Sequence, residues 1–414
     1  SYGSLGNGNI DPYSFQELFK IQQSERILNG IRPQYTSQPA VIPLGLTWEK
    51  STTLNLGLDL SFLSNRLHFS GDIYQRKTTD MFTVGMSLPA VFGTDVPKGN
   101  YADLTTKGFE LSVSWRDQFP LAGKPFNYEL RFTLADYQST IDKYNNPEKK
   151  LGDGYYYEGM KVGEIWGYET EGFFTSQEDI DTHAKQPYFY AGATAGQWLP
   201  GDIKFKDLNG DRVIDYGNNT VDNPGDQKII GNSEPRFIYS FNLSADWRNF
   251  FVSAFFQGVG KQDWWPGSEA SYFWGMYNRP YNDMPKSHLG NIWSEENPDT
   301  YFPRLRGYAS EEPYAELNLK QTRYLQNIAY IRMKNLQIGY TLPRSIVSKI
   351  RMQNAKVYIS GENLWSWSPF YKHSKDLDVE AVRGSDKDLT EGNSGNGYNY
   401  PILKSISFGL SVTF

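Results

Sequence analysis

Apolar and polar residues alternate with a period of two along most of the recognisable segments of this chain. Successive side chains of a β-strand point to opposite faces, so this alternation predicts strands with one apolar face. With a stub at residues 1–6, the pattern predicts about ten strands of roughly 9–11 residues, a length that crosses a bilayer obliquely. The apolar positions are Leu54, Leu56, Leu58, Leu60 and Phe62; Leu67, Phe69 and Ile73; Phe109, Leu111, Val113 and Trp115; Phe126, Tyr128, Leu130, Phe132 and Leu134; Phe237, Tyr239, Phe241, Leu243, Ala245 and Trp247; Phe250, Val252, Ala254 and Phe256; Leu336, Ile338, Tyr340 and Leu342; Ala355, Val357 and Ile359; and Ile406, Phe408, Leu410, Val412 and Phe414.

The links between these strands alternate strictly between short and long. Short links lie near 63–66, 116–125, 248–249 and 343–353, and long links lie near 7–50, 77–106, 137–235, 260–327 and 367–399. This alternation predicts an antiparallel sheet with tight turns at one end and large loops at the other. Bacterial outer-membrane barrels have this layout, with periplasmic turns and extracellular loops, whereas a β-sandwich has no reason to separate its loops by length. The sequence therefore predicts an all-β protein that is a portion of an antiparallel transmembrane β-barrel.

Aromatic residues near the predicted strand ends fit a girdle at the membrane interface. Trp115, Trp247, Tyr340 and Trp365 hold such positions. Trp and Tyr are enriched at both interfaces of a bilayer. Ordinary core packing is the alternative, because a soluble core is also rich in aromatic residues.

Composition narrows the classes of function. Aromatic residues make up 16% of the chain and mean hydropathy is -0.59, a combination that alternation explains because averaging hides a barrel's apolar face. A net charge of -6 without a basic stripe argues against a nucleic-acid partner. The chain has no Cys and 4 scattered His, which leaves little material for thiol chemistry, a catalytic triad or a histidine metal site. We therefore expect that the chain is not an enzyme.

Several segments resemble the SusC/RagA class of TonB-dependent transporters, in the order that this class would place them. The segments are SYGSLGN, GLTWEKSTTLNLGLDLSFLSNRLHFSGDIYQRKTTDM, NYADLTTKGFELSVSW, PGDIKFKDLNGDRVID with IIGNSEPRFIYSFN, HLGNIWSEENPDTYFPRL, YIRMKNLQIGYTLP and VYISGENLWSWS. Three features depart from the class. Arg212 stands where its acidic loop usually has Gly, residues 216–225 lengthen that loop, and DLDVE replaces a more common Asp-Pro-Glu-Val phrase.

The resemblance implies a fold, a function and partners. It implies that residues 1–414 are the C-terminal part of a barrel of about 22 strands, with the plug domain and the N-terminal barrel strands absent. The lack of an initial Met or leader fits a processed or truncated start. The implied function is active import of nutrient oligomers, oligosaccharides or peptides, across the outer membrane of a Gram-negative, Bacteroidetes-like bacterium. The implied partners are the remaining barrel and plug, a SusD-like surface lipoprotein, the TonB complex acting through the plug, and surrounding lipid and lipopolysaccharide.

An acidic loop has the ligand spacing of an EF-hand. Asp207, Asn209, Asp211 and Asp215 stand at relative positions 1, 3, 5 and 9, and Asp226 could close the set after the insertion. Oxygens at alternate positions of a tight loop can converge on Ca²⁺, so a structural Ca²⁺ is one prediction. A solvated loop of Asx-turns without an ion is the other, and a salt bridge from Arg212 would be a third way to neutralise the cluster. No cofactor besides this ion is expected.

A second long loop is unusually aromatic. It carries Trp264, Trp265, Tyr272, Trp274 and Tyr277, and aromatic faces can stack on sugar rings or on apolar peptide side chains. Contact with cargo or with a lid protein is one hypothesis, and packing against neighbouring loops is the other. Both hypotheses also suit the alternative function, a secreted or surface β-rich glycan-binding protein or adhesin, which leaves the alternation of link lengths unexplained.

Overall fold

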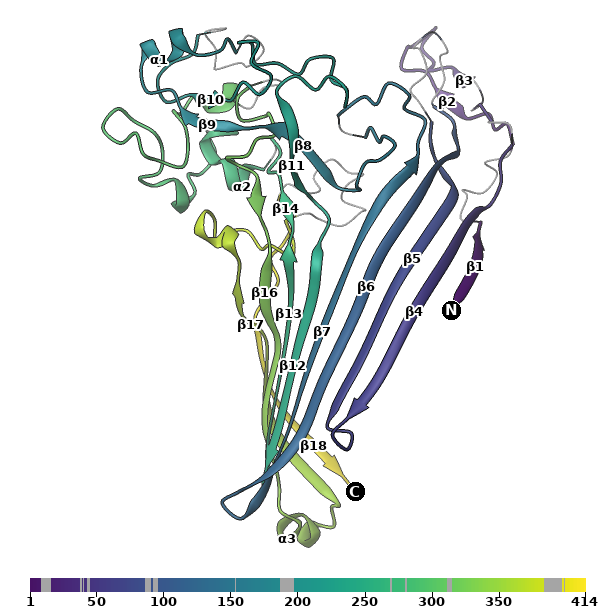
Figure 1. Ribbon diagram of the computed structural model, residues 1–414, viewed down its shortest axis with the longest axis vertical. Helices are drawn as coiled ribbons and strands as arrows, with labels where there is room; N and C mark the ends of the chain where they lie inside the picture. Colours follow the sequence, from purple (N-terminus) through teal and green to yellow (C-terminus); the bar gives the residue numbers. More distant parts are fainter. Residues whose placement is uncertain are drawn as a thin grey trace.

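The chain folds into one large curved sheet with loops gathered at one end (Figure 1). The structure is a computed structural model. It describes residues 1–8, 16–37, 39, 41–42, 45–85, 91, 96–152, 154–186, 197–268, 270–279, 281–310, 315–382, 397 and 399–414.

Ten antiparallel strands form the main sheet, which confirms the number predicted from the alternation. Every link between neighbouring strands of the sheet joins strands consecutive along the chain, apart from small strands inside the loops. In sheet order the strands are β1 (Tyr2–Asn7), β4 (Glu49–Phe62), β5 (Leu67–Val84), β6 (Lys98–Leu121), β7 (Lys124–Lys143), β12 (Arg236–Trp247), β13 (Phe250–Lys261), β16 (Tyr330–Thr341), β17 (Asn354–Trp367) and β18 (Ser405–Thr413).

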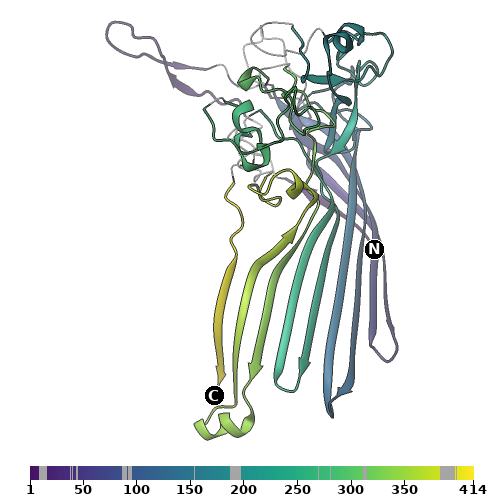
Figure 2. The same cartoon turned by 90° about the vertical axis from the view of Figure 1, so that its left-hand side faces the viewer.

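The ends of the sheet differ as the link lengths predicted. The β4–β5, β6–β7 and β12–β13 turns lie at one end with the short helix α3 (Arg344–Val347), and the long links lie at the other (Figures 1 and 2). The predicted strand length of 9–11 residues is wrong for most strands: β5 has 18 residues, β6 has 24 and β7 has 20. The expected link at 116–125 shrinks to Ala122–Gly123, where both residues have positive φ. These strands are longer than the roughly 9–11 residues that cross a bilayer. The parts outside the bilayer do not contact lipid, so apolar and polar residues need not alternate in them.

The two faces of the sheet differ in polarity. One cross-strand row consists of Leu60, Phe69, Val113, Phe132, Phe241 and Phe256. The adjacent row consists of Asp59, Ser70, Ser112, Thr133, Ser240 and Gln257. Within the polar row, Ser70 Oγ donates to Asp59 Oδ1 at 2.6 Å and the hydroxyls of Thr133 and Ser240 lie 2.6 Å apart. The apolar face continues to the last strand, where Phe408 is 81% exposed.

Aromatic residues of the predicted girdle divide between the two ends. Trp247 and Tyr340 lie near the turn end, where both face Phe250 across the sheet. Trp115 lies inside β6, because the strand runs on to Leu121, and its Nε1 donates to the Tyr128 hydroxyl at 3.0 Å. Trp365 lies toward the loop end of β17 and is exposed.

The long links contain small elements of their own. Four two-stranded sheets join β2 (Ile21–Gln23) to β3 (Gln34–Thr36), β8 (Glu164–Tyr168) to β11 (Gln227–Asn232), β9 (Thr170–Phe173) to β10 (Ile203–Phe205) and β14 (Asp263–Trp264) to β15 (Gln326–Asn327). Among the described residues, the helices of these links are α1 (Gln177–Thr182), α2 (Ser271–Trp274) and the 3₁₀ turns Gly275–Tyr277, Lys286–His288, Gly307–Ser310 and Pro369–Lys372, whereas the 3₁₀ turn Ser348–Ile350 follows α3 in the short link. Within the part of the chain that the structure covers, no helix is long and apolar enough to span a membrane.

Candidate functional site

The three long links that follow β7, β13 and β17 share one buried cluster, here called the loop core. Its apolar residues pack into a single cluster that also includes Val259 and Tyr330 at the strand ends. Burying such large side chains stabilises the loops by the hydrophobic effect and by dispersion contacts. The loop residues are Tyr168, Ile203, Phe205, Ile214, Trp264, Ala270, Phe273, Trp274, Tyr277, Phe302, Leu317, Tyr324, Ile328, Phe370, Leu377, Val379 and Val382.

The aromatic residues proposed to contact cargo lie mostly inside this core. Trp264, Trp274 and Tyr277 are buried, and the Tyr277 hydroxyl donates to the Pro303 carbonyl at 2.6 Å. Their faces are occupied by other loop residues, as the packing hypothesis describes, and contact of this loop with cargo or a lid protein stays a prediction. Trp265 is half-buried, and Tyr272 is 57% exposed.

The acidic loop is held by hydrogen bonds from its own backbone. Asp207 accepts from the N–H groups of Gly210 at 2.6 Å and Arg212 at 2.9 Å, and Asp211 accepts from Val213 at 2.8 Å. Arg212 has φ 65° there, the left-handed conformation that its position in an EF-hand-like loop demands, at a cost of about 1 kcal/mol.

The carboxylate that closes the loop is also engaged by backbone groups. Asp226 is fully buried and accepts from the N–H groups of Leu208 at 2.7 Å and Asp215 at 2.9 Å. Asn209 Nδ2 donates to Asp211 Oδ2 at 2.9 Å, so a donor nitrogen points at one proposed ligand oxygen. Among residues that the structure describes, no group of three or more His, Cys, Asp or Glu is arranged to hold a metal ion. This arrangement is complete without an ion, and the Ca²⁺ site stays a prediction.

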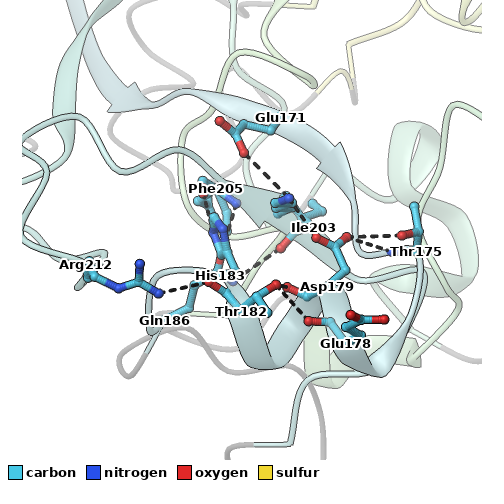
Figure 3. Close-up of polar contacts among 11 residues, drawn as sticks. Glu171, Thr175, Glu178, Asp179, Thr182, His183, Gln186, Ile203, Phe205 and Arg212 are labelled. Carbon is cyan, nitrogen blue, oxygen red and sulfur yellow. Dashed lines mark hydrogen bonds and ion pairs between the residues drawn. The ribbon is translucent and has the colours of Figure 1, made fainter.

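Arg212 does not neutralise the loop through a salt bridge. Its guanidinium donates at 2.9 Å to the carbonyl of Thr182, the last residue of α1 (Figure 3). Nearby, His183 Nε2 contacts the Phe205 carbonyl at 2.8 Å, and Lys204 pairs with Asp179 at 2.8 Å. The acidic loop is thus attached to α1 and β10, and the third alternative for its charge is wrong.

A buried carboxyl pair joins two loops that are far apart in sequence. Asp202 forms a bidentate ion pair with Arg306 at 2.7 and 2.5 Å. Glu316 Oε2 accepts the Ile203 N–H at 2.8 Å, and both carboxyl groups are fully buried. Burial and the nearby Asp202 carboxylate raise the pKa of Glu316 well above its usual value. One guanidinium faces two carboxyl groups, so Glu316 keeps its proton while Asp202 stays paired.

Three ion pairs, Arg332 with Asp378 and with Glu380 and Lys334 with Glu380, attach the last loop to the barrel wall. Arg332 on β16 donates to Asp378 at 2.6 Å, and Lys334 donates to Glu380 at 2.5 Å. Asp378 Oδ2 also accepts the Ile402 N–H at 3.1 Å. The DLDVE phrase that departs from the family thus supplies both anchoring carboxylates.

Comparisons with known proteins agree with this architecture. No family model matches the chain. Over its full length it is 26% identical to TonB-dependent receptor P3 and 27% identical to TonB-dependent receptor P26, both of Formosa agariphila, and it covers 39% of each. It is 22% identical to TonB-dependent receptor SusC of Bacteroides thetaiotaomicron, covering 37% of that protein. The RagAB peptide transporter structure superposes with a TM-score of 0.72 at 21% identity, over all of this chain and 40% of the transporter chain.

The resemblance to SusC/RagA-type TonB-dependent transporters is confirmed. The ten-stranded sheet has the fold of a portion of such a transporter barrel, and these relatives are named as receptors and transporters rather than enzymes. The chain spans about two fifths of the length of the curated relatives that it matches. The comparisons therefore show the barrel fold of this chain and its similarity to SusC-like proteins. The activity of the intact protein is proposed below.

Sequence reasoning missed the groups that join the loops to one another. Asp202 and Arg306 are 104 residues apart in the sequence, and Ile203 and Glu316 are 113 residues apart. The spacing of residues within one segment cannot predict a contact between segments this far apart. The one available signal was the density of charged residues in segments that also carry large apolar residues.

Proposed function

We propose that this chain is the C-terminal wall of an outer-membrane barrel that imports nutrient oligomers, working with a SusD-like surface lipoprotein and energised through TonB. The observation that supports it most is the sorting of the sheet, with an apolar and a polar cross-strand row on opposite faces over the six strands from β4 to β13. A membrane-spanning barrel requires this sorting, because lipid contacts one face and a polar lumen contacts the other.

The proposal assigns the missing parts to the same protein. The sheet order begins at β1 and ends at β18, so among the described residues neither outer edge has a neighbouring strand. Unpaired backbone groups in lipid cost several kcal/mol each, which requires further strands along both edges. These would be the N-terminal strands of a barrel of about 22, closed around a plug that contacts TonB. Turns such as 63–66 would then face the periplasm, and the loop core would lie outside the cell.

The cargo would be an oligosaccharide or a peptide. The relatives leave both open, because RagAB is named as a peptide transporter and the receptors carry no cargo in their names. A loop core rich in buried aromatic residues gives the extracellular face a fixed shape, which suits docking of a lipoprotein lid above it.

A cell-based experiment tests the proposal. The full-length protein should fractionate with outer membranes, require detergent for extraction, and support growth on its cargo only when TonB is present. Protease added to intact cells should cut in the long links and spare the 63–66 and 248–249 turns. A secreted adhesin, the alternative function, would wash into buffer and would leave growth unchanged when its gene is deleted. That result would refute the importer.

A further inference from the structure

A pocket of about 550 Å³ lies beside the two-stranded sheet of β8 and β11, and Tyr168 of the loop core forms part of its lining (β8 and β11 are labelled in Figure 1). Its walls come from three segments: residues 151–168, residues 216–227 and residues 318–320. Ligand pockets commonly have volumes of roughly 300–1,000 Å³ and combine an apolar lining with a few fixed polar groups. This pocket has both features.

Part of the pocket lining is apolar and buried. Leu151, Tyr157 and Met160 line the pocket and belong to a small apolar cluster of their own. Two tyrosines line the pocket with exposed surface, Tyr155 at 43% and Tyr216 at 37%. The pocket therefore combines exposed aromatic surface with buried apolar side chains.

The polar wall is fixed by a chain of hydrogen bonds. Trp166 Nε1 donates to the Tyr157 hydroxyl at 3.2 Å, and that hydroxyl donates to Glu164 Oε2 at 2.6 Å. The other oxygen of Glu164 accepts the Lys161 N–H at 3.1 Å. Burial raises the pKa of Tyr157, so the phenol stays protonated and keeps donating. Across the pocket, Asn219 Nδ2 donates to the Leu151 carbonyl at 2.9 Å, which orients the amide.

The backbone beside the pocket is already paired. The outer edge of β8 is covered because Tyr168 N–H donates to the Lys320 carbonyl at 2.8 Å and Thr322 N–H donates to the Tyr168 carbonyl at 3.0 Å. The other edge of β8 pairs with β11. Strand addition to a free edge is one way in which a protein binds an extended peptide, and the backbone of Tyr168 is not free for it. At this end of β8 we therefore expect side chains to make the contacts with a ligand.

We propose that this pocket binds one sugar ring of a neutral oligosaccharide. The exposed tyrosines present flat faces for the C–H groups of the ring, and the carboxylate of Glu164 with the neighbouring amides accepts and donates hydrogen bonds to its hydroxyls. The proposal rests on the importer function, whose cargo it narrows to a carbohydrate.

Titration of the purified full-length protein in detergent tests it. The probes are maltohexaose, cellohexaose, laminarihexaose and xylohexaose, with a tryptic digest of casein as the peptide probe. At least one saccharide should bind saturably, and Tyr155→Ala should weaken it about fivefold to tenfold, the scale of one lost aromatic contact. Tyr155→Phe keeps the ring face and should stay within about twofold of the parent. Tyr281→Ala is the matched control, since Tyr281 is 78% exposed and does not line the pocket.

Three results would overturn the proposal. They are a lack of saturable binding by all four saccharides, equal effects of Tyr155→Ala and Tyr281→Ala, and peptide binding that Tyr155→Ala abolishes. Outer-membrane fractionation and TonB-dependent growth are measured separately on the same variants. A variant that still supports import while the saccharides fail to bind contradicts the sugar pocket alone and leaves the importer standing.

Discussion

Glu316 is a buried carboxyl group whose protonation depends on the folded loops. Its pKa is raised by burial and by Asp202, so the folded protein holds a proton that an unfolded chain releases above the usual value of 4.5. The stability of the loops is therefore fullest below that value and falls as pH rises toward the folded pKa, by at most about 1.4 kcal/mol per pH unit.

The Ile203 amide reports this proton directly, because it donates to Glu316. Its protection against hydrogen exchange, corrected for the intrinsic rate, should decrease between pH 5 and 8. Glu316→Gln carries no titratable proton and should make the profile flat while keeping the loops folded. A profile in the parent that is as flat as that of Glu316→Gln would show that Glu316 is not protonated in the folded state.

Substitution of Asp207, combined with a chelator, tests whether a bound Ca²⁺ or backbone hydrogen bonds hold the acidic loop. Asp207→Ala removes the acceptor of the Gly210 and Arg212 N–H groups, so it should loosen residues 207–226 by about 1–2 kcal/mol in local stability. The Ca²⁺ prediction adds that chelator loosens the same segment and that added Ca²⁺ reverses it, with limited proteolysis as the measurement. If chelator changes nothing while Asp207→Ala still increases cleavage, backbone hydrogen bonds hold the loop and the ion prediction fails.

At the scale of the elements, alternation predicted where strands occur better than where they end. The β12–β13 turn at Arg248–Asn249 was predicted correctly because apolar alternation runs up to both sides of it. The start of β6 at Lys98 was not, because residues 98–106 pair with their neighbours without alternating between apolar and polar side chains. Alternation reports contact with lipid, and a strand that extends beyond the lipid loses that signal without losing its hydrogen bonds.

The loop elements could not be predicted for a different reason. The aromatic residues between Trp264 and Tyr277 were visible, but their burial depends on Phe302, Tyr324 and Phe370 from other segments. The sequence shows that these aromatic residues are present. Only the tertiary contacts determine whether they pack inside the protein or stay exposed to a ligand. The acidic loop is the exception, because its geometry follows from bonds among near neighbours.

The two edge strands give a prediction at this scale. In the full-length protein, the amides of β18 that face away from β17 should exchange slowly, since another strand pairs with them in a closed barrel. In residues 1–414 alone, the same amides should exchange fast, while those of central β12 serve as the control in both samples. Fast exchange along that edge in the full-length protein would mean that the barrel does not close at β18.

At the scale of the whole molecule, the proposed importer requires that the apolar face of the sheet contacts lipid. Three adjacent pairs of residues lie on opposite faces: Leu58 and Asp59, Gln337 and Ile338, and Ile359 and Ser360. The 414 residues contain no Cys, so a single spin label can be placed at each of these positions once any Cys elsewhere in the full-length protein is replaced.

The most direct test is the accessibility of these six labels in the full-length protein in lipid vesicles. Labels at Leu58, Ile338 and Ile359 should be relaxed by membrane-dissolved oxygen and shielded from a water-soluble nickel complex. Labels at Asp59, Gln337 and Ser360 should show less oxygen relaxation than their neighbours. Equal accessibility of both faces to the nickel complex would contradict a membrane-spanning barrel wall, and with it the importer.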